Sequence, residues 1–135
     1  MKISRRDAIA RVALLAAWSL VPRRAWSLQG EPFPHPDPRP GITAANVLPP
    51  EQLPDRKRVR AAFDAARANP EVFDGVYCVC ECAEGMSHRS LLACFESKQP
   101  TGCWGCQEQA EALARWVKQG KTLAEIREAV DRKWG

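Results

Sequence analysis

Apolar residues recur at helical spacing in several stretches between residues 55 and 135. In the first stretch they fall at i, i+3, i+4 and i+7, which places them on one face of a helix. These positions are Val59, Ala62, Phe63 and Ala66. The helix is predicted to end at Asn69, because the residue before a proline is disfavoured in the helical region. Pro70 then opens a short turn that runs through Phe73.

Two longer helices are predicted nearer the C-terminus. One starts between Thr101 and Cys103 and runs to Gln119, just before a glycine that can end it. Its apolar face consists of Cys106, Ala110, Leu113, Ala114 and Val117. The last helix begins at Thr122, because residues 122–125 form a capping box. Its apolar stripe consists of Leu123, Ile126, Val130 and Trp134.

The stretch between these helices has no helical period. Residues 75–84 carry three cysteines at alternate positions and are predicted to be extended or looped. Ser87 is predicted to cap a brief helix that ends near Cys94. The apolar side of that helix consists of Leu91, Leu92 and Phe95. We therefore expect a small, mainly α-helical domain over residues 55–135, with four to five short helices and a cysteine-rich loop.

The first 27 residues have the pattern of an export signal. Ser4 precedes the pair Arg5 and Arg6, and the apolar run that follows is too short for a membrane span and is interrupted by Arg11. The pattern resembles a twin-arginine signal peptide, and cleavage is predicted after Ser27. The alternative is an uncleaved amphipathic anchor. We expect a periplasmic or secreted protein with no stable membrane span after cleavage.

The positive charge of the chain belongs mostly to this segment. Residues 1–27 hold six of the 20 basic residues and one of the 16 acidic residues, which leaves 14 and 15. The cleaved chain is therefore close to neutral. This balance gives no basis for a nucleic-acid or anionic-membrane partner.

Proline dominates the segment that follows the signal. Alternate prolines over residues 32–40 remove backbone donors and favour an extended chain. Residues 28–54 are therefore predicted to form a semi-rigid, disordered linker. His35 is interpreted as an ordinary residue of that linker, with weak metal ligation as the alternative. The remaining domain, residues 55–135, is small enough that disulfides or a metal commonly stabilise such folds.

Six cysteines within residues 78–106 form the candidate site. They are Cys78, Cys80, Cys82, Cys94, Cys103 and Cys106. A disulfide between cysteines two positions apart on an extended chain is strained. A fully oxidised protein would need each of the first three cysteines bonded to one of the last three. Such a protein would be a disulfide-stapled envelope scaffold or an interaction protein.

Metal binding removes this difficulty. Thiolates select Cu(I), zinc or iron–sulfur clusters, and a Cys-x-Cys pair can hold one ion or bridge two if the backbone curls. Gly105 relieves crowding between Cys103 and Cys106 at a helix start, where the helix dipole favours anionic ligands. His88 and Met86 are further donors, a combination more typical of copper than of a four-cysteine zinc site.

We therefore predict a thiolate-ligated metal, Cu(I) first and zinc second, held by all six cysteines with His88. The expected role is a metal carrier, store or delivery protein for an envelope metalloprotein, without catalytic residues. A redox role remains the alternative, because Cys103 and Cys106 form a Cys-x-x-Cys pair at a helix start. Covalent haem attachment is not expected, since Gln107 stands where a histidine is required.

The cysteine-containing segments carry a family resemblance. They comprise residues 77–82, 94–95, 102–106 and 120–127, with Gly85 and His88 between them. Between Phe73 and Trp134 the chain resembles the bacterial PCYCGC-motif family of lipoproteins and secreted proteins. Proline, tyrosine and glycine of the motif are replaced here by Tyr77, Val79 and Glu81. No cysteine stands near the cleavage point, so a lipid anchor is not expected. The resemblance implies an envelope location and a cysteine-centred site.

Overall fold

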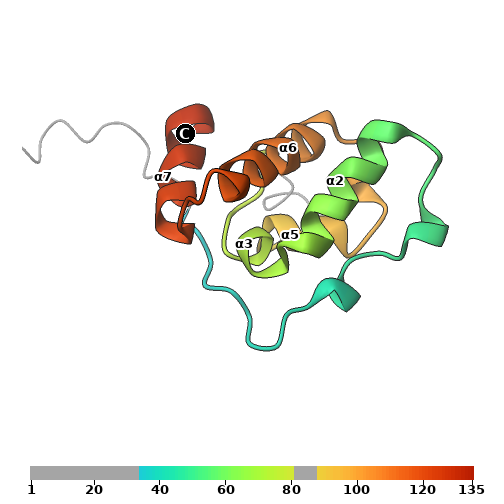
Figure 1. The fold of residues 1–135 in the computed structure, drawn as a ribbon, viewed down its shortest axis with the longest axis horizontal. Coiled ribbons are helices and arrows are strands. Elements are labelled where there is room, and N and C mark those ends of the chain that lie inside the picture. Colours follow the sequence, from blue (N-terminus) through green and yellow to red (C-terminus); the bar gives the residue numbers. More distant parts are fainter. Residues whose placement is uncertain (1–33, 81–87) are drawn as a thin grey trace, which may run out of the picture. The chain divides into compact units, whose positions relative to one another are not determined.

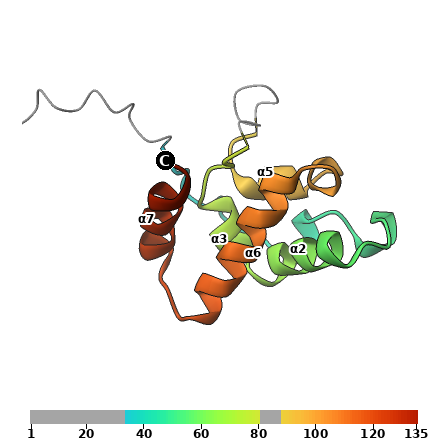
Figure 2. The ribbon, with the colours of Figure 1, turned by 90° about the horizontal axis from the view of Figure 1, so that it is seen from above.

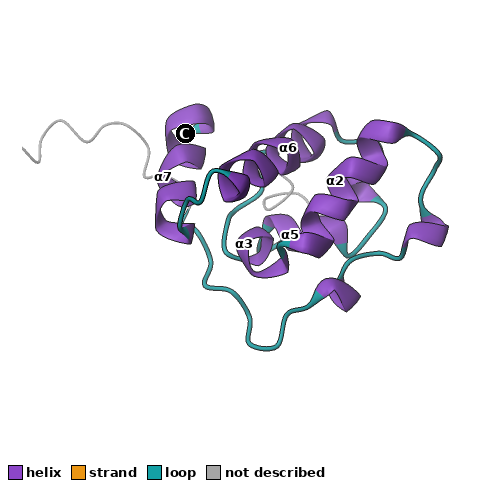
Figure 3. Cartoon of the chain, viewed as in Figure 1, coloured by secondary structure: helices purple, strands orange, loops and turns teal. Residues whose placement is uncertain are grey.

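The computed structural model describes residues 34–80 and 88–135, and the regular elements in those ranges are helices (Figure 3). The α-helices are α2 (Lys57–Ala68), α3 (Pro70–Asp74), α5 (Leu91–Phe95), α6 (Trp104–Lys118) and α7 (Leu123–Trp134). Two 3₁₀ turns, η3 (Ala44–Asn46) and η4 (Pro50–Gln52), precede α2, and a third, η5 (Gln99–Thr101), lies between α5 and α6. The predicted mainly α fold is confirmed. Within the described residues, no helix has both the length and the hydropathy needed to cross a bilayer.

Helix α2 follows the apolar pattern of its sequence. The four positions at i, i+3, i+4 and i+7, from Val59 to Ala66, are all buried. The helix ends at Ala68, and α3 starts at Pro70. A proline is tolerated there because a backbone N–H at the first position of a helix has no partner within the helix. Helix α2 packs against α6, and both contact α3 (Figures 1 and 2).

Three phenylalanines fill the space where α2, α3 and α5 meet. Phe63, Phe73 and Phe95 are fully buried. The ring of Phe95 meets Phe63 at a centroid distance of 4.8 Å and Phe73 at 5.5 Å, and both pairs are edge-to-face. Each pair of this geometry contributes about 1 kcal/mol beyond its buried area. This cluster fixes α5, which carries Cys94, against the rest of the core.

The cap of α5 differs from the prediction. The Oγ atom of Ser90 accepts a hydrogen bond from the Ala93 N–H at 3.3 Å, so Ser90 is the N-cap. Ser87, the predicted cap, lies outside the described residues. Ser90 directly precedes the apolar run Leu91–Phe95, which makes it the better-placed hydroxyl.

Helix α6 ends in the left-handed turn that its glycine predicts. Gly120 has a φ of 80°, and its N–H donates to the carbonyl of Val117. The N–H of Lys121 donates to the carbonyl of Trp116, which completes a Schellman motif. The turn redirects the chain so that α7 packs against α6.

Helix α7 begins as predicted. Thr122 and Glu125 form both hydrogen bonds of the capping box. The rings of Trp116 and Trp134 meet edge-to-face at 6.2 Å and join α7 to α6.

The proline-rich segment packs on the core, so the predicted linker is wrong for residues 34–54. Its three buried aliphatic side chains are Ile42, Val47 and Leu53. The backbone N–H of Leu48 also donates to the carbonyl of Phe95 at 2.9 Å. Figure 1 shows this segment in cyan and teal alongside α3 and α5. Prolines remove donors but leave the apolar residues between them free to pack, so the packed unit extends well before residue 55.

A buried carboxylate ties the same segment to α3 and α5. Asp74 is fully buried and accepts hydrogen bonds from Arg39, Arg89 and Ser90. Burial alone would raise the pKa of Asp74, but these hydrogen bonds outweigh it and lower the pKa to about 2. Arg39 also pairs with Glu96 at 2.5 Å. The charged network therefore holds three segments together near the cysteines.

Candidate metal centre

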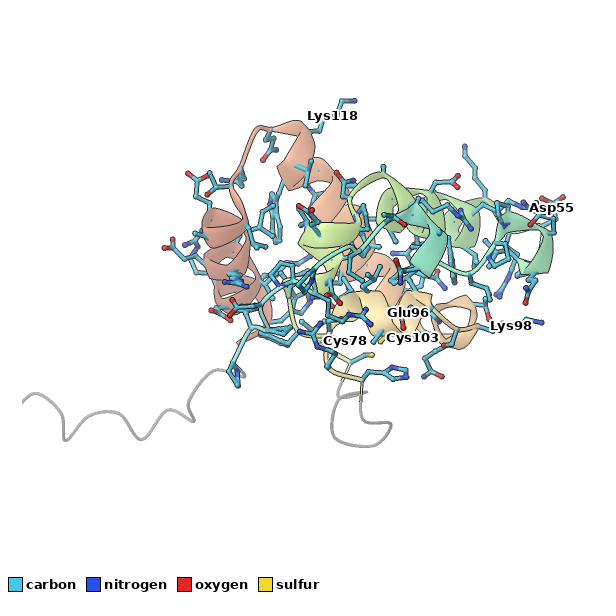
Figure 4. The ribbon with its side chains drawn as sticks, turned by 90° about the horizontal axis from the view of Figure 1, so that it is seen from below. Asp55, Cys78, Glu96, Lys98, Cys103 and Lys118 are labelled. Atoms are coloured by element: carbon cyan, nitrogen blue, oxygen red, sulfur yellow. The ribbon has the colours of Figure 1, made fainter. Side chains whose placement is uncertain are left out.

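Five cysteines from three segments meet at the start of α6. Cys78 and Cys80 follow α3, Cys94 lies on α5, Cys103 is the N-cap of α6 and Cys106 lies in its first turn. Figure 4 shows Cys78 and Cys103 on the same side of the molecule, although they are far apart in the sequence.

The sulfur atoms form two groups that share one member. The deep group consists of Cys78, Cys94 and Cys106, all buried. The outer group consists of Cys80, Cys103 and Cys106, of which the first two are partly exposed. Within each group the three sulfurs lie within 4.8 Å of one another, close enough to bind a common ion.

Three sulfur–sulfur distances describe the centre of the cluster. Cys78 lies 3.0 Å from Cys80 and 3.7 Å from Cys106, and Cys80 lies 3.3 Å from Cys106. These distances exceed the length of a disulfide bond, about 2.05 Å. The backbone turns at residues 79–80, and the two sulfurs of the Cys-x-Cys pair lie close together.

A glutamine on α6 holds this turn. The fully buried Gln109 accepts a hydrogen bond from the Val79 N–H at 3.1 Å and donates one to the Tyr77 carbonyl at 2.8 Å. The two bonds bracket Cys78. Sequence reasoning missed Gln109, although it lies three residues after Cys106 on the buried face of α6.

A glycine lets the outer group form. A Cβ atom on Gly105 would lie 3.2 Å from the Cβ of Cys80, which is tighter than ordinary packing. The Sγ atom of Cys103 accepts a hydrogen bond from the Cys106 N–H at 3.3 Å. This bond caps α6 and fixes the two cysteines of its first turn relative to each other.

His88 contacts the deep group. Its Nδ1 atom lies 3.1 Å from the Sγ of Cys94, so an imidazole nitrogen is available beside these sulfurs. Two other predicted donors, Cys82 and Met86, lie outside the described residues. Of the seven predicted ligands, six are therefore described, and all six lie in one cluster.

The sulfurs influence one another's ionisation. Hydrogen bonding from Cys106, and then from Cys80 and Cys94, lowers the pKa of Cys78. The same bond with Cys78, followed by those with Cys80 and Cys94, raises the pKa of Cys106. The cluster thus favours one thiolate at Cys78, and a metal ion that binds the other sulfurs releases their protons.

A comparison with protein families finds a match over most of the chain. A family model described as "Protein of unknown function with PCYCGC motif" matches residues 37–135. The chain belongs to the PCYCGC family. The match begins inside the proline-rich segment, as expected if that segment is part of the folded unit. No curated protein and no solved structure matches the chain.

The PCYCGC motif corresponds to residues 77–82, and the residue at its first position makes a hydrogen bond to His35. Tyr77 replaces the proline of the motif, and its backbone N–H, which a proline lacks, donates to Nδ1 of His35 at 3.3 Å. The Nε2 atom of His35 lies 3.1 Å from a carboxylate oxygen of Asp131. Burial lowers the pKa of His35 although Asp131 opposes this shift, so the neutral ring with Nε2–H suits both contacts. His35 is therefore a structural tie between Tyr77 and α7.

Proposed function

We propose that this member of the PCYCGC family is an exported thiolate metal-binding protein that carries, stores or delivers its ion. Cu(I) is the first candidate and zinc the second. The observation that carries the proposal is the pair of overlapping three-sulfur groups. Clustered cysteines at this density are the ligand set that soft metal ions select.

The sulfur spacing supports metal binding. An ion bonded to thiolates at about 2.3 Å separates neighbouring sulfurs by roughly 3.8 Å in a tetrahedral site and by about 4.0 Å in a trigonal site. The Cys78–Cys106 distance of 3.7 Å is close to both values, and the Cys80–Cys106 distance of 3.3 Å requires a displacement of less than about 1 Å. Side-chain rotation can supply that displacement without moving the helices.

The donor set ranks the two candidate metals. Each group offers three sulfurs, and three thiolates suit a soft univalent ion such as Cu(I). Structural zinc takes four ligands in a tetrahedron. The deep group supplies three of these, and the fourth can come from His88, whose Nδ1 lies beside Cys94, or from Cys80, whose sulfur lies 3.0 Å from that of Cys78. Zinc is therefore the second candidate, because it needs a fourth ligand from outside the three-sulfur group.

The N-terminal pattern supports export of a loaded protein. Ser4, Arg5 and Arg6 match the start of a twin-arginine signal, a route that carries folded proteins. Loading in the reducing cytoplasm would protect the thiols from oxidation before export. The recipient would be a metalloprotein of the cell envelope.

Metal analysis and thiol counting on protein purified from the periplasm test this proposal. We expect stoichiometric copper or zinc, and thiols that react once the metal is removed. Cys106→Ser should lose the metal, whereas Lys98→Ser, an exposed position in the nearby loop, should retain it. Metal-free protein with every cysteine in a disulfide would contradict the proposal and favour a stapled scaffold.

A thiol–disulfide redox function is the second candidate. The half-buried Cys103 and buried Cys106 at the start of α6 resemble the exposed and resolving thiols of redox enzymes. The corresponding test is an insulin-reduction assay. Activity that Cys103→Ser alone abolishes would support it, and inactive wild-type protein would rule it out.

A further inference from the structure

Cys106 belongs to both sulfur groups. Its sulfur lies 3.7 Å from that of Cys78 in the deep group and 3.3 Å from that of Cys80 in the outer group. A thiolate sulfur has more than one lone pair and can bind two soft ions at once. The position of Cys106 is that of a bridging ligand between two neighbouring ions.

The number of donors agrees with two three-coordinate ions. Two such ions that share one ligand need five donors, and the two groups together contain five cysteines. Two four-coordinate zinc ions that share one ligand need seven donors. The two groups together with His88 supply six, so the described donor set fits a pair of Cu(I) ions better than a pair of zinc ions.

A single ion in the middle of the cluster fits less well. The central triangle of Cys78, Cys80 and Cys106 has edges of 3.0, 3.3 and 3.7 Å. The centre of this triangle lies roughly 1.9 Å from each sulfur, so an ion with metal–thiolate bonds of about 2.3 Å must leave the plane or push the three sulfurs apart. Ions placed on either side, one in each group, avoid this crowding.

The two groups differ in access to solvent. All three sulfurs of the deep group are buried, and two cysteines of the outer group are partly exposed. An ion in the outer group can be reached by an external ligand, whereas one in the deep group is enclosed by α5, α6 and the turn at residues 79–80. A shared sulfur allows an ion to pass between the groups by ligand exchange without leaving the protein.

We propose that the protein holds two Cu(I) ions bridged by the Cys106 thiolate, an exchangeable ion in the outer group and a retained ion in the deep group. This inference rests on the proposed metal-binding function and specifies its stoichiometry and order of exchange.

The test is anaerobic titration of the reduced full-length protein with Cu(I) in competition with the chelator bicinchoninate. Wild-type protein is expected to retain two ions. Cys94→Ser, which removes a ligand of the deep group alone, and Cys103→Ser, which removes one of the outer group alone, should each retain one. Cys106→Ser should retain none. The ion left in Cys94→Ser should pass to the chelator about tenfold faster than the ion left in Cys103→Ser.

The outcomes separate this inference from the proposed function. If the wild type binds one ion and all three variants lose it, the proposed metal binding stands but the bridged pair of ions is overturned. The bridged pair is also overturned if Cys106→Ser retains as much Cu(I) as the other two variants. Wild-type protein that binds neither Cu(I) nor zinc overturns the proposed function itself. X-ray absorption spectroscopy of the copper-loaded wild-type protein needs no variant, so a folding defect cannot affect it. A second copper atom close to the absorbing copper supports the inference, and a spectrum without one contradicts it.

Discussion

At the scale of single residues, the shape of the cysteine turn depends on one buried amide. Gln109 pairs with the N–H of Val79 and the carbonyl of Tyr77, on either side of Cys78. Both backbone groups would otherwise lie beside the buried core without partners. The side chain thus stabilises the fold and also sets the direction of the Cys78 sulfur.

Replacement of Gln109 tests this role. Gln109→Leu keeps the volume but leaves two backbone groups unpaired, so the free energy of unfolding should fall by about 2 kcal/mol. Retention of Cu(I) against bicinchoninate should fall as well, because the turn is no longer held. Gln119→Leu, at the exposed end of the same helix, is the matched control and should change neither quantity. Urea denaturation and the chelator assay measure both, and unaltered copper retention in Gln109→Leu would contradict the role.

Gly105 offers a second test, in which two effects oppose each other. Gly105→Ala gains about 1 kcal/mol of helix propensity. However, the new Cβ meets Cys80 at 3.2 Å and pushes it from the outer group. We expect nearly unchanged stability with faster loss of the exchangeable ion. Gly102→Ala adds a methyl group in open space and is the control. Equal exchange rates in the two variants would show that Gly105 has no role in the outer group.

At the scale of elements, the proline-rich segment is held to α3 and α5 by charge as well as by packing. Asp74 at the end of α3 is bound by Arg39 of that segment and by Arg89 before α5. A buried carboxylate with several donors is strongly favoured in its ionised form. Removal of this charge should therefore loosen all three segments together.

The stability of the protein should depend on pH through Asp74. Its pKa is about 2 in the folded protein, below the ordinary value of 3.8, so ionisation favours the folded state. The stabilisation, about 2 kcal/mol, is present above pH 4 and is lost as the pH falls towards 2. Asp74→Asn should therefore be less stable than wild type at pH 7, with a smaller difference at pH 2.5.

Thermal denaturation across this pH range measures the effect. The control is Asp64→Asn, since Asp64 is exposed and pairs only with Arg67 among the contacts described. An exposed pair of this kind contributes about 0.5 kcal/mol or less. Equal stability of wild type and Asp74→Asn at pH 7 would refute the assignment.

At the scale of the whole molecule, the metal is expected to stabilise one part of the fold more than another. The proposed ligands come from residues 78–106, which include α5 and the start of α6. Helix α7 has its own capping box and its Trp116–Trp134 contact, and supplies no ligand. Metal-linked stability should therefore be concentrated around the cysteines.

Removal of the ion by a chelator tests this distribution. We expect amide exchange to accelerate over residues 76–106 and helical circular dichroism to fall, while α7 remains partly helical. Hydrogen exchange followed by mass spectrometry resolves the two regions. An unchanged circular dichroism spectrum after complete removal of the metal would count against the prediction.

The positions of the helices follow from the sequence because they depend on neighbouring residues. The i, i+3, i+4, i+7 pattern located α2, the capping box located α7, and the glycine at 120 located the end of α6. Local signals were insufficient where partners came from elsewhere. Alternate prolines over residues 32–40 predicted an unpacked linker as far as residue 54, yet the apolar residues at positions 42, 47 and 53 pack on the helical core.

The inventory of sulfur donors was likewise apparent from the sequence, since cysteine spacing alone argues for a soft metal or disulfides. Which sulfurs belong together was decided only by the tertiary structure. The double membership of Cys106, the support from Gln109 and the tie through His35 each join segments far apart in the chain. Sequence periodicity cannot predict such distances, because they are set by how α3, α5 and α6 pack on a common core.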